Sequence, residues 1–397
     1  MIKMRYISAL ALSILFCWIA WASYSYFFDT TLPSIKMQGI NNDCHYCSDI
    51  QCSVSSNKTG DISIWLDNQP LINKFKFKAT QQEYPFIIPT KTISNGSHQL
   101  KTELVDSTFN KNKTVMEHAF YVDNKPLQAA LIKPDTSYKV FQGRTLHIQL
   151  QTNKEINSAK ISALAQEYKC FPESKNSLIY ECFIPISCEE QPNEYLFSVD
   201  IIDKVGNTLH LDNKFQVVMY PFKKKTLQIS PEKIKQEEEL GIDNKKFEKI
   251  INEIINNSPQ EKLWRGTFCT PIDIERISCE FGTIRTTQHK GRYAHKALDV
   301  INTPKSVVWA PQDGVIVLKE RFAFSGNTIV IDHGWGVLSL FFHLDDFANI
   351  AVNEKIKKGN PVGTIGKTGY ATGYHLHWEM RIGNIPIDPM QWTKTTF

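Results

Sequence analysis

The sequence has little net charge and lacks the common nucleotide-binding signatures. Its formal charge at pH 7 is +4 over 397 residues, from 45 basic and 41 acidic side chains. This balance is too even to indicate a nucleic-acid partner, which would need a concentrated basic surface. A phosphate-binding loop, a dinucleotide fingerprint and a Gly-x-Ser-x-Gly nucleophile elbow are also missing. We therefore expect no nucleic acid among the partners.

One long apolar run lies near the N-terminus. Residues 7–28 carry no charge, and Lys3 and Arg5 precede them. About 20 apolar residues suffice to cross a bilayer as a helix, and the positive-inside rule keeps the N-terminus cytoplasmic. A cleaved signal peptide is the alternative, because Ala20 to Ala22 fits a small-x-small site, but the apolar run continues beyond it. We expect residues 1–30 to form a cytoplasmic tip and a single-pass anchor in the inner membrane, with the rest of the chain in the periplasm or another extracytoplasmic space.

Eight of the nine cysteines lie outside the apolar run. Export to an oxidising compartment predicts disulfides among them. Cys269 and Cys279 are close in sequence and would staple a hairpin. The other six form two triplets, so either a bond links the triplets or each leaves a thiol free: Cys44, Cys47 and Cys52, and Cys170, Cys182 and Cys188. A C-x-x-C pair at Cys44 and Cys47 is weak evidence for metal binding or disulfide exchange.

The middle of the chain predicts two β modules. Short runs that alternate apolar and polar residues, separated by Asn-Gly and Asp-Asn turns, fill residues 31–124, and a similar set fills residues 125–222. Length and strand spacing fit two immunoglobulin-like β-sandwiches. Neither contains a catalytic cluster, so we expect a role as spacer, as wall-binding module or as docking site for an envelope protein partner.

Residues 223–262 predict a helical linker. Ser230 and Pro231 suit a helix start, and five apolar residues then recur at helical spacing: Phe247, Ile250, Ile251, Ile254 and Ile255. The pattern is too short for the sustained heptads of a coiled coil. We expect this amphipathic segment to pack on the C-terminal domain.

Six of the eleven histidines lie between His289 and His377. His375 and His377 flank Leu376 in a strand-like run, so both imidazoles project to one face. Together with the His295-x-x-x-Asp299 pair they supply the two-histidine, one-carboxylate set that leaves a catalytic zinc one open position. Since His343 is also present, two imidazoles remain for proton transfer or transition-state stabilisation. A single strand histidine is more often a core or edge residue, and here the clustering favours a site.

Three neighbouring residues have other interpretations. His333, flanked by Gly334, is typical of a hairpin turn, and His289 is typical of a loop. Glu379 is either a carboxylate that holds a ligand imidazole in place or one half of a salt bridge at the edge of the core.

The segment from about residue 263 to the C-terminus resembles the lysostaphin-type (LytM-like) zinc metallopeptidases, whose members cut peptide bonds in bacterial peptidoglycan. The order and spacing of several motifs carry the resemblance: Phe281-Gly282-x-x-Arg285, His295-x-x-x-Asp299, Ala310-Pro311-x-Asp313-Gly314, Ser325-Gly326-Asn327-Thr328, Phe342-His343-Leu344, Lys358-Gly359-x-x-Val362-Gly363, Thr368-Gly369 and His375-Leu376-His377-Trp378-Glu379.

The resemblance implies a fold, a cofactor and residue roles. It implies an antiparallel β metallopeptidase domain over residues 263–397, of the duplicated-hybrid-motif type. It makes His295, Asp299 and His377 the zinc ligands, and His343 and His375 the catalytic pair. The implied activity is zinc-dependent hydrolysis of peptide cross-links or stem peptides of peptidoglycan. The fold class expected for the chain is mainly β, with an N-terminal transmembrane helix and a short helical linker.

Three departures from the family pattern affect the surroundings of the site and leave every ligand in place. Ala297 stands where glycine is usual, which would strain the loop only at a positive φ. Tyr374 replaces a proline, and Phe341 with Phe342 precedes His343 where a tyrosine or small residue is common.

Two alternatives remain for the function. One is a regulator with the same fold that activates a separate wall amidase, and degenerate relatives of that kind lose zinc ligands. The other is the same chemistry directed at a protein substrate.

Overall fold

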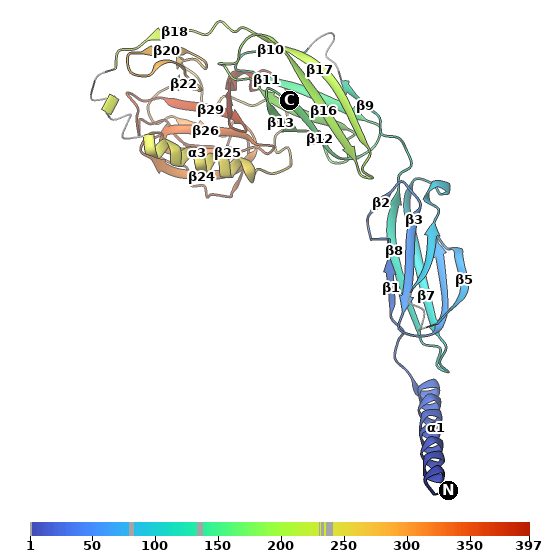
Figure 1. Ribbon diagram of the computed structural model, residues 1–397. Coiled ribbons are helices and arrows are strands. Elements are labelled where there is room, and N and C mark those ends of the chain that lie inside the picture. The colour runs from blue at the N-terminus through green and yellow to red at the C-terminus, as the bar shows by residue number, and fades with distance from the viewer. Residues whose placement is uncertain (1, 79–82, 133–137, 230, 232–233, 236–240) are drawn as a thin grey trace. The chain divides into compact units, whose positions relative to one another are not determined.

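The computed structural model describes residues 2–78, 83–132, 138–229, 231, 234–235 and 241–397, and the fold is mainly β, as predicted (Figure 1). Internal contacts divide the chain into two units, Met1–Pro126 with Lys204–Gly206 and Leu127–Asp203 with Asn207–Phe397. The second β module and the C-terminal domain therefore belong to one unit.

The first unit contains the N-terminal helix and the first β module. Helix α1 (Ile2–Phe28) includes a stretch, Ala11–Phe28, that is long and apolar enough to cross a membrane, although a signal sequence has the same properties. The module has a three-stranded and a five-stranded sheet around its own core. In sheet order their strands are β1 (Ile35–Gln38), β3 (Ile50–Ser56) and β6 (Tyr84–Ile88), and β2 (His45–Tyr46), β8 (Lys113–Val122), β7 (Gly96–Asp106), β4 (Gly60–Leu66) and β5 (Gln69–Phe77).

The second module also has two sheets and an apolar core of its own. One sheet is β10 (Tyr138–Phe141), β17 (Thr208–Val218), β16 (Glu194–Asp203), β12 (Ile156–Ala163) and β13 (Gln166–Lys169). The other is β14 (Phe171–Pro172), β15 (Ile179–Pro185), β11 (Thr145–Thr152) and β9 (Ala129–Ile132). The immunoglobulin-like assignment of both modules and their limits stay predictions.

The C-terminal domain is built on one large antiparallel sheet. Its strands are, in sheet order, β19 (Arg276–Cys279), β22 (Leu298–Ile301), β29 (Leu376–Ile382), β26 (Val337–Leu344), β25 (Gly326–Asp332), β24 (Gly314–Phe322) and β27 (Lys355–Ile356), and β30 (Ile385–Ile387) pairs with β29. Two small sheets join β18 (Lys224–Thr226) to β20 (Ile284–Thr287) and β21 (Gly291–Ala294), and β23 (Val307–Trp309) to β28 (Pro361–Thr364). A short helix, α4 (Pro389–Trp392), follows near the C-terminus.

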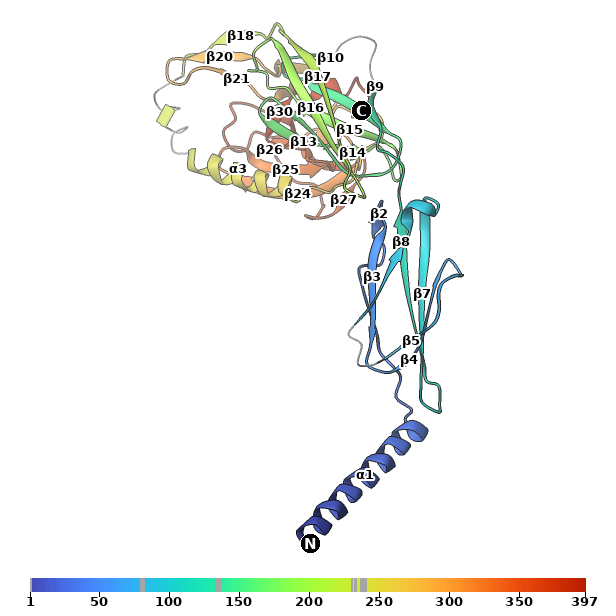
Figure 2. The same cartoon turned by 45° about the vertical axis from the view of Figure 1, so that its right-hand side comes forward.

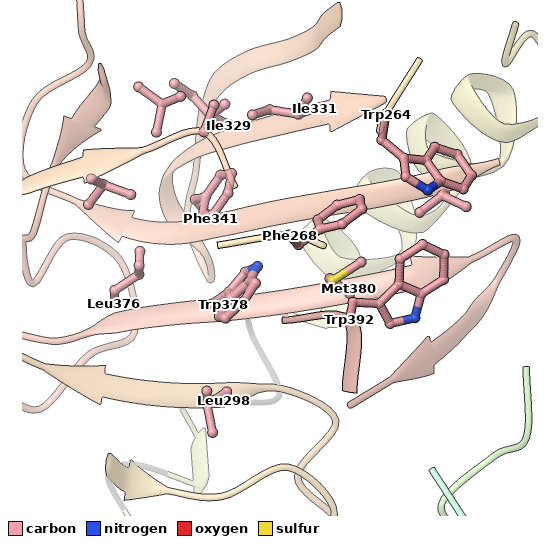
Figure 3. Packing of buried hydrophobic residues seen from close by; sticks show 14 of the residues in the cluster. Trp264, Phe268, Leu298, Ile329, Ile331, Phe341, Leu376, Trp378, Met380 and Trp392 are labelled. Atoms are coloured by element: carbon pink, nitrogen blue, oxygen red, sulfur yellow. The ribbon is translucent and has the colours of Figure 1, made fainter. Parts of the chain in front are cut away.

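Side-chain alternation along β29 separates the core from the site. Leu376, Trp378 and Met380 point into the apolar core, where Trp264 and Trp392 join them (Figure 3). The intervening residues of the strand face the other way, as the period of a strand requires. The predicted separation from Leu376 is confirmed for His377, whereas His375 lies just before the strand in an isolated bridge with Gly366.

Helix α3 (Gly241–Asn256) lies along strands β24 and β25 in both views (Figures 1 and 2). Phe247 and Ile251 are buried against Phe322 and Phe342 of the sheet. The predicted packing of the amphipathic segment on the C-terminal domain is confirmed. The helix start expected near Ser230 falls largely outside the described residues, because residues 230, 232 and 233 are not among them.

The predicted disulfides are wrong. All nine cysteines lie among the described residues, and each carries a free thiol. The Cys269 thiol points to the carbonyl oxygen of Pro311 at 3.4 Å, whereas Cys279 Sγ contacts the Arg285 guanidinium at 3.2 Å. The two side chains thus face different partners, and a disulfide requires their Cβ atoms to approach to about 4 Å. Compartment and count alone carry no information on that geometry.

Candidate metal centre

Asp299 is the centre of the site because of where strand β22 lies. In the sheet register it stands opposite His377 of β29 on one side and Cys279 of β19 on the other. Directly opposed residues project to the same face and come within contact distance. Asp299 Oδ1 lies 2.8 Å from His377 Nδ1, and Oδ2 lies 3.0 Å from His295 Nε2. The three predicted ligands therefore meet at one carboxylate.

The Phe-Gly turn before β20 holds His295 in position. Gly282 N–H donates to the carbonyl oxygen of His295 at 2.7 Å, and His295 N–H donates to the carbonyl oxygen of Thr283 at 2.9 Å. Gly282 has φ of 75°, and a Cβ there would lie 2.1 Å from the Phe222 ring. Only glycine fits this turn, which gives the motif a structural reason.

Burial and charge fix the protonation of these groups. Burial lowers the pKa of His295 to about 4, although the Asp299 carboxylate acts in the opposite direction. Burial alone would raise the pKa of Asp299, but the imidazoles of His295 and His377 outweigh it and hold that pKa well below its usual range. At neutral pH the site therefore presents a carboxylate and a neutral imidazole, the forms that bind metal ions.

His295 shows that these side chains suit a cation. It is 6% exposed, and its Nε2 has no partner in hydrogen-bond geometry among the described residues. Its 3.0 Å contact with Asp299 Oδ2 lacks the angle of a hydrogen bond, so it replaces the lost interactions with water only in part. A metal ion at this point would satisfy it. Two imidazoles and one carboxylate are the donors of zinc sites that keep one position open.

His343 reaches the site through an irregularity in the sheet. The register between β25 and β26 shifts between Asn327 and Ile329, which places a β-bulge at Phe342 and His343. His343 has φ of 62°, a left-handed conformation that non-glycine residues seldom adopt outside functional sites. The bulge re-aims the side chain, so that its ring centroid lies 4.9 Å from that of His375.

Backbone carbonyl oxygens orient both remaining imidazoles. His343 Nδ1 lies 2.9 Å from the carbonyl oxygen of Thr368, and His375 Nδ1 lies 2.9 Å from that of Gly373. Because a carbonyl oxygen only accepts, each Nδ1 carries the hydrogen and each Nε2 keeps its lone pair. His375 Nε2 is 4.0 Å from Asp299 Oδ1. Burial lowers the pKa of His343 to about 3.

The departures from the family pattern fit the fold. Ala297 is fully buried and is not among the residues with positive φ, so its methyl group causes no backbone strain. Phe341 belongs to the apolar core. Phe342 stacks on the His377 imidazole with ring centroids 5.0 Å apart and planes 7° apart, which fixes the orientation of that ring. Tyr374 lines a pocket beside Asp299 and His375.

The other residues considered from the sequence have structural roles. His333 lies in the connection between β25 and β26, as predicted, but it is fully buried and bonds the Asp313 carbonyl oxygen and Ser339 Oγ. His289 is an exposed turn residue between β20 and β21. Glu379 pairs with the buried Arg381, so of its two interpretations the salt bridge is correct.

Sequence reasoning missed Cys279 and Arg285 at the site. The thiol and the guanidinium both border Asp299, the latter with NH2 3.5 Å from Asp299 Oδ2. The Phe281-Gly282-x-x-Arg285 motif gives Arg285 no role, and the sequence predicts a disulfide for Cys279. The donor set, together with two further imidazoles on one face of an antiparallel sheet, defines the site of a metal-dependent hydrolase.

Comparison with known proteins identifies the domain. Residues 293–389 match the family model of peptidase family M23. The chain is 31% identical over 121 residues to peptidoglycan DD-endopeptidase ShyC of Vibrio cholerae, which covers 30% of this chain and 28% of that protein. It is 36% identical over 121 residues to DD-carboxypeptidase/endopeptidase Mpg of Neisseria meningitidis. This match covers 30% of this chain and 27% of the Neisseria protein. A peptidase M23 structure from Pseudomonas aeruginosa matches with a TM-score of 0.45 at 19% identity, over 64% of this chain and 94% of that one.

The C-terminal domain is thus an M23 peptidase domain, and the resemblance to the lysostaphin-type peptidases is confirmed. The matched region spans less than a third of the length of these curated relatives. The similarity therefore identifies this domain and does not extend to the whole chain.

Proposed function

We propose that this chain is a zinc-dependent endopeptidase that hydrolyses peptide cross-links or stem peptides of peptidoglycan. The observation that carries the proposal is the convergence of His295, Asp299, His343, His375 and His377 on one face of the M23 domain. The names of the relatives support a D,D bond in the cross-links as the target.

His295, Asp299 and His377 would hold the zinc ion. The two imidazoles contact the one carboxylate, and the buried Nε2 of His295 has no partner in hydrogen-bond geometry in the described part of the chain. A zinc ion bound there supplies Lewis-acid polarisation of the scissile carbonyl and a water of lowered pKa. The stacked ring of Phe342 keeps His377 oriented, as the surroundings of a ligand imidazole commonly do.

His343 and His375 supply the proton transfers. Each has Nδ1 held by a carbonyl oxygen, so each Nε2 is free to take a proton from the attacking water or, once protonated, to donate to the developing oxyanion. Their ring centroids lie 4.9 Å apart, which allows both to act on one substrate carbonyl.

An envelope location fits this substrate. Helix α1 contains a stretch that can cross a membrane. We propose that it anchors the chain in the inner membrane, with the M23 domain on the extracytoplasmic side, where peptidoglycan is found. The first β module then has the role of spacer, wall-binding element or docking site for an envelope protein.

Digestion of purified sacculi tests the proposal. Full-length protein in detergent is incubated with sacculi and zinc, beside His295→Ala, His343→Ala and, as a matched control, His210→Ala, which removes an exposed imidazole of β17. We expect new peptide ends from the wild type and the control alone, with zinc lost from His295→Ala and retained by His343→Ala. Absence of release from zinc-loaded wild type would refute the proposal and favour an amidase regulator or a protein substrate.

A further inference from the structure

Cys279 stands beside the metal site because of a second bulge. Strand β19 pairs Ile277 with Val300 and Cys279 with Asp299, so Ser278 is an extra residue. In a regular antiparallel register Ser278 would stand opposite Asp299. The bulge replaces that hydroxyl with a thiol and turns the thiol to the face of the carboxylate.

The thiol lies within reach of a shared cation. Cys279, His295 and Asp299 each offer one ligand atom, and these atoms all lie within 4.8 Å of one another. All three side chains are buried, and Cys279 is 6% exposed. Among the described residues the buried Nε2 of His295 has no partner in hydrogen-bond geometry, and its contact is the shared carboxylate at 3.0 Å, which points independently to a cation at this place.

Arg285 holds the Cys279 sulfur beside the Asp299 carboxylate. Its NH2 donates to Cys279 Sγ at 3.2 Å and lies 3.5 Å from Asp299 Oδ2. A guanidinium stays protonated at any physiological pH, so it stabilises negative charge on both atoms without itself binding a metal. The contact fixes the sulfur next to the carboxylate that a metal ion would share.

We propose that Cys279 is a fourth protein ligand of the metal, bound through its thiolate. On binding, a sulfur–metal bond forms and the thiol proton leaves to solvent. The thiolate would join His295 and Asp299, whose ligand atoms lie within 4.8 Å of the sulfur, and His377 bonds the same carboxylate. An open position for water would then require release of the thiolate or a rise in the coordination number. The inference rests on the proposed function only in that zinc occupies this site.

Zinc X-ray absorption on the full-length wild-type protein tests the ligand directly, without a substitution. We expect one sulfur neighbour at about 2.3 Å beside nitrogen and oxygen neighbours at about 2.0–2.2 Å. A spectrum that is described by nitrogen and oxygen alone would overturn the inference.

Cobalt substitution tests the same bond with variants. The cobalt-loaded wild type should show an intense near-ultraviolet thiolate-to-cobalt band, which Cys279→Ser and Cys279→Ala lose while still binding one cobalt. The matched control Cys269→Ser removes a thiol that faces the Pro311 carbonyl oxygen, and it should keep the band. Zinc affinity measured against a chelator should fall at least about tenfold in Cys279→Ser and stay unchanged in the control. A band that survives loss of Cys279 would contradict the assignment.

These measurements separate the inference from the function. If sulfur ligation is found but no variant digests sacculi, the proposed substrate is wrong and the ligand assignment holds. If sacculi are digested and no sulfur is bound, the function holds and the fourth ligand is refuted.

Discussion

Phe183 of the second β module packs in the core of the M23 domain. Replacing it with alanine should lower the free energy of unfolding of the unit that contains both. Phe183 lies in β15 and is 6% exposed. Its ring centroid lies 5.8 Å from that of Trp264, 5.9 Å from Trp335, 5.7 Å from Trp392 and 5.7 Å from Phe397. The ring therefore fills a site that the M23 domain lines with four large aromatic side chains.

The structure sets the expected size of the effect. Phe183→Ala removes a buried ring, for which losses of about 3–5 kcal/mol are typical. The upper part of this range applies when the surroundings do not collapse into the cavity. Aromatic rings fixed in a dense core relax little, and each lost ring pair adds about 0.5–1.5 kcal/mol. We therefore expect a loss of about 4 kcal/mol in the free energy of unfolding.

Urea unfolding of the full-length protein, followed by tryptophan fluorescence, measures this loss. Trp264, Trp335 and Trp392 surround the substituted ring, so the signal reports on the contact itself. Phe141→Ala is the matched control, because Phe141 belongs to the same module but is 49% exposed, and it should cost less than about 0.5 kcal/mol. A Phe183→Ala loss below about 1 kcal/mol would refute the view that module and domain share one core.

Three further effects involve the buried side chains of His333, His343 and Arg381. Burial lowers the pKa of His333 to about 4 in the folded protein. Between pH 6.5 and pH 4 this imidazole is therefore protonated in the unfolded chain and neutral in the folded protein. Stability should thus fall by up to about 3 kcal/mol as the pH drops from 6.5 to 4, and urea midpoints against pH should show a shallower slope in His333→Gln. His343→Ala should lower the rate of peptide release from sacculi about 10²–10⁴-fold while one zinc per chain remains, and a matching loss of zinc would contradict its role as a catalytic residue. Glu248→Gln weakens a bidentate pair with Arg381 (2.7 and 2.9 Å) and should cost about 1–2 kcal/mol in urea unfolding, whereas an unchanged midpoint would show that Glu379 alone suffices.

Regular periodicity explains why much of the site could be predicted. Alternation along β29 places His377 and Glu379 on one face and Trp378 on the core face, and the sequence alone fixes that parity. The helical spacing of Phe247 and Ile251 likewise gave the packing of α3. Both patterns repeat over several residues, so the face that each pattern predicts to be apolar is also the face that the structure buries.

Irregular geometry explains what the sequence left out. A bulge brings Cys279 opposite Asp299, and the sequence does not indicate it. His343 also lies at a bulge, but the clustering of histidines and the family resemblance already place it in the site. One inserted residue leaves no periodic trace in a single sequence, and it changes which side chain faces the site. The predicted pairing of Cys269 with Cys279 is wrong for the same reason. The two residues are close in sequence, but the bulge turns the Cys279 thiol toward Asp299 and away from Cys269.

Burial on both faces of β15 is a signal that only the structure interprets. Cys182 and Ile184 face the core of the second module, while Phe183 between them belongs to the core of the M23 domain. Glu181 is also buried, and it pairs with His147 and Lys262. The strand is therefore a nearly continuous apolar run. From the sequence alone it is not possible to predict which part of the protein covers the face that carries Phe183.

Contacts between the second module and the M23 domain also hold the backbone of the predicted metal ligand His295. Gly143 has φ of 77°, and a Cβ there would lie 2.6 Å from the ring of Phe281. Phe281 precedes Gly282, whose N–H holds the carbonyl oxygen of His295, and Phe222 closes on Gly282 from the end of the module. The backbone that carries His295 is thus fixed by side chains from both parts of the unit. A ligand imidazole must be held within a fraction of an ångström, so the second module is part of the framework that makes the metal site.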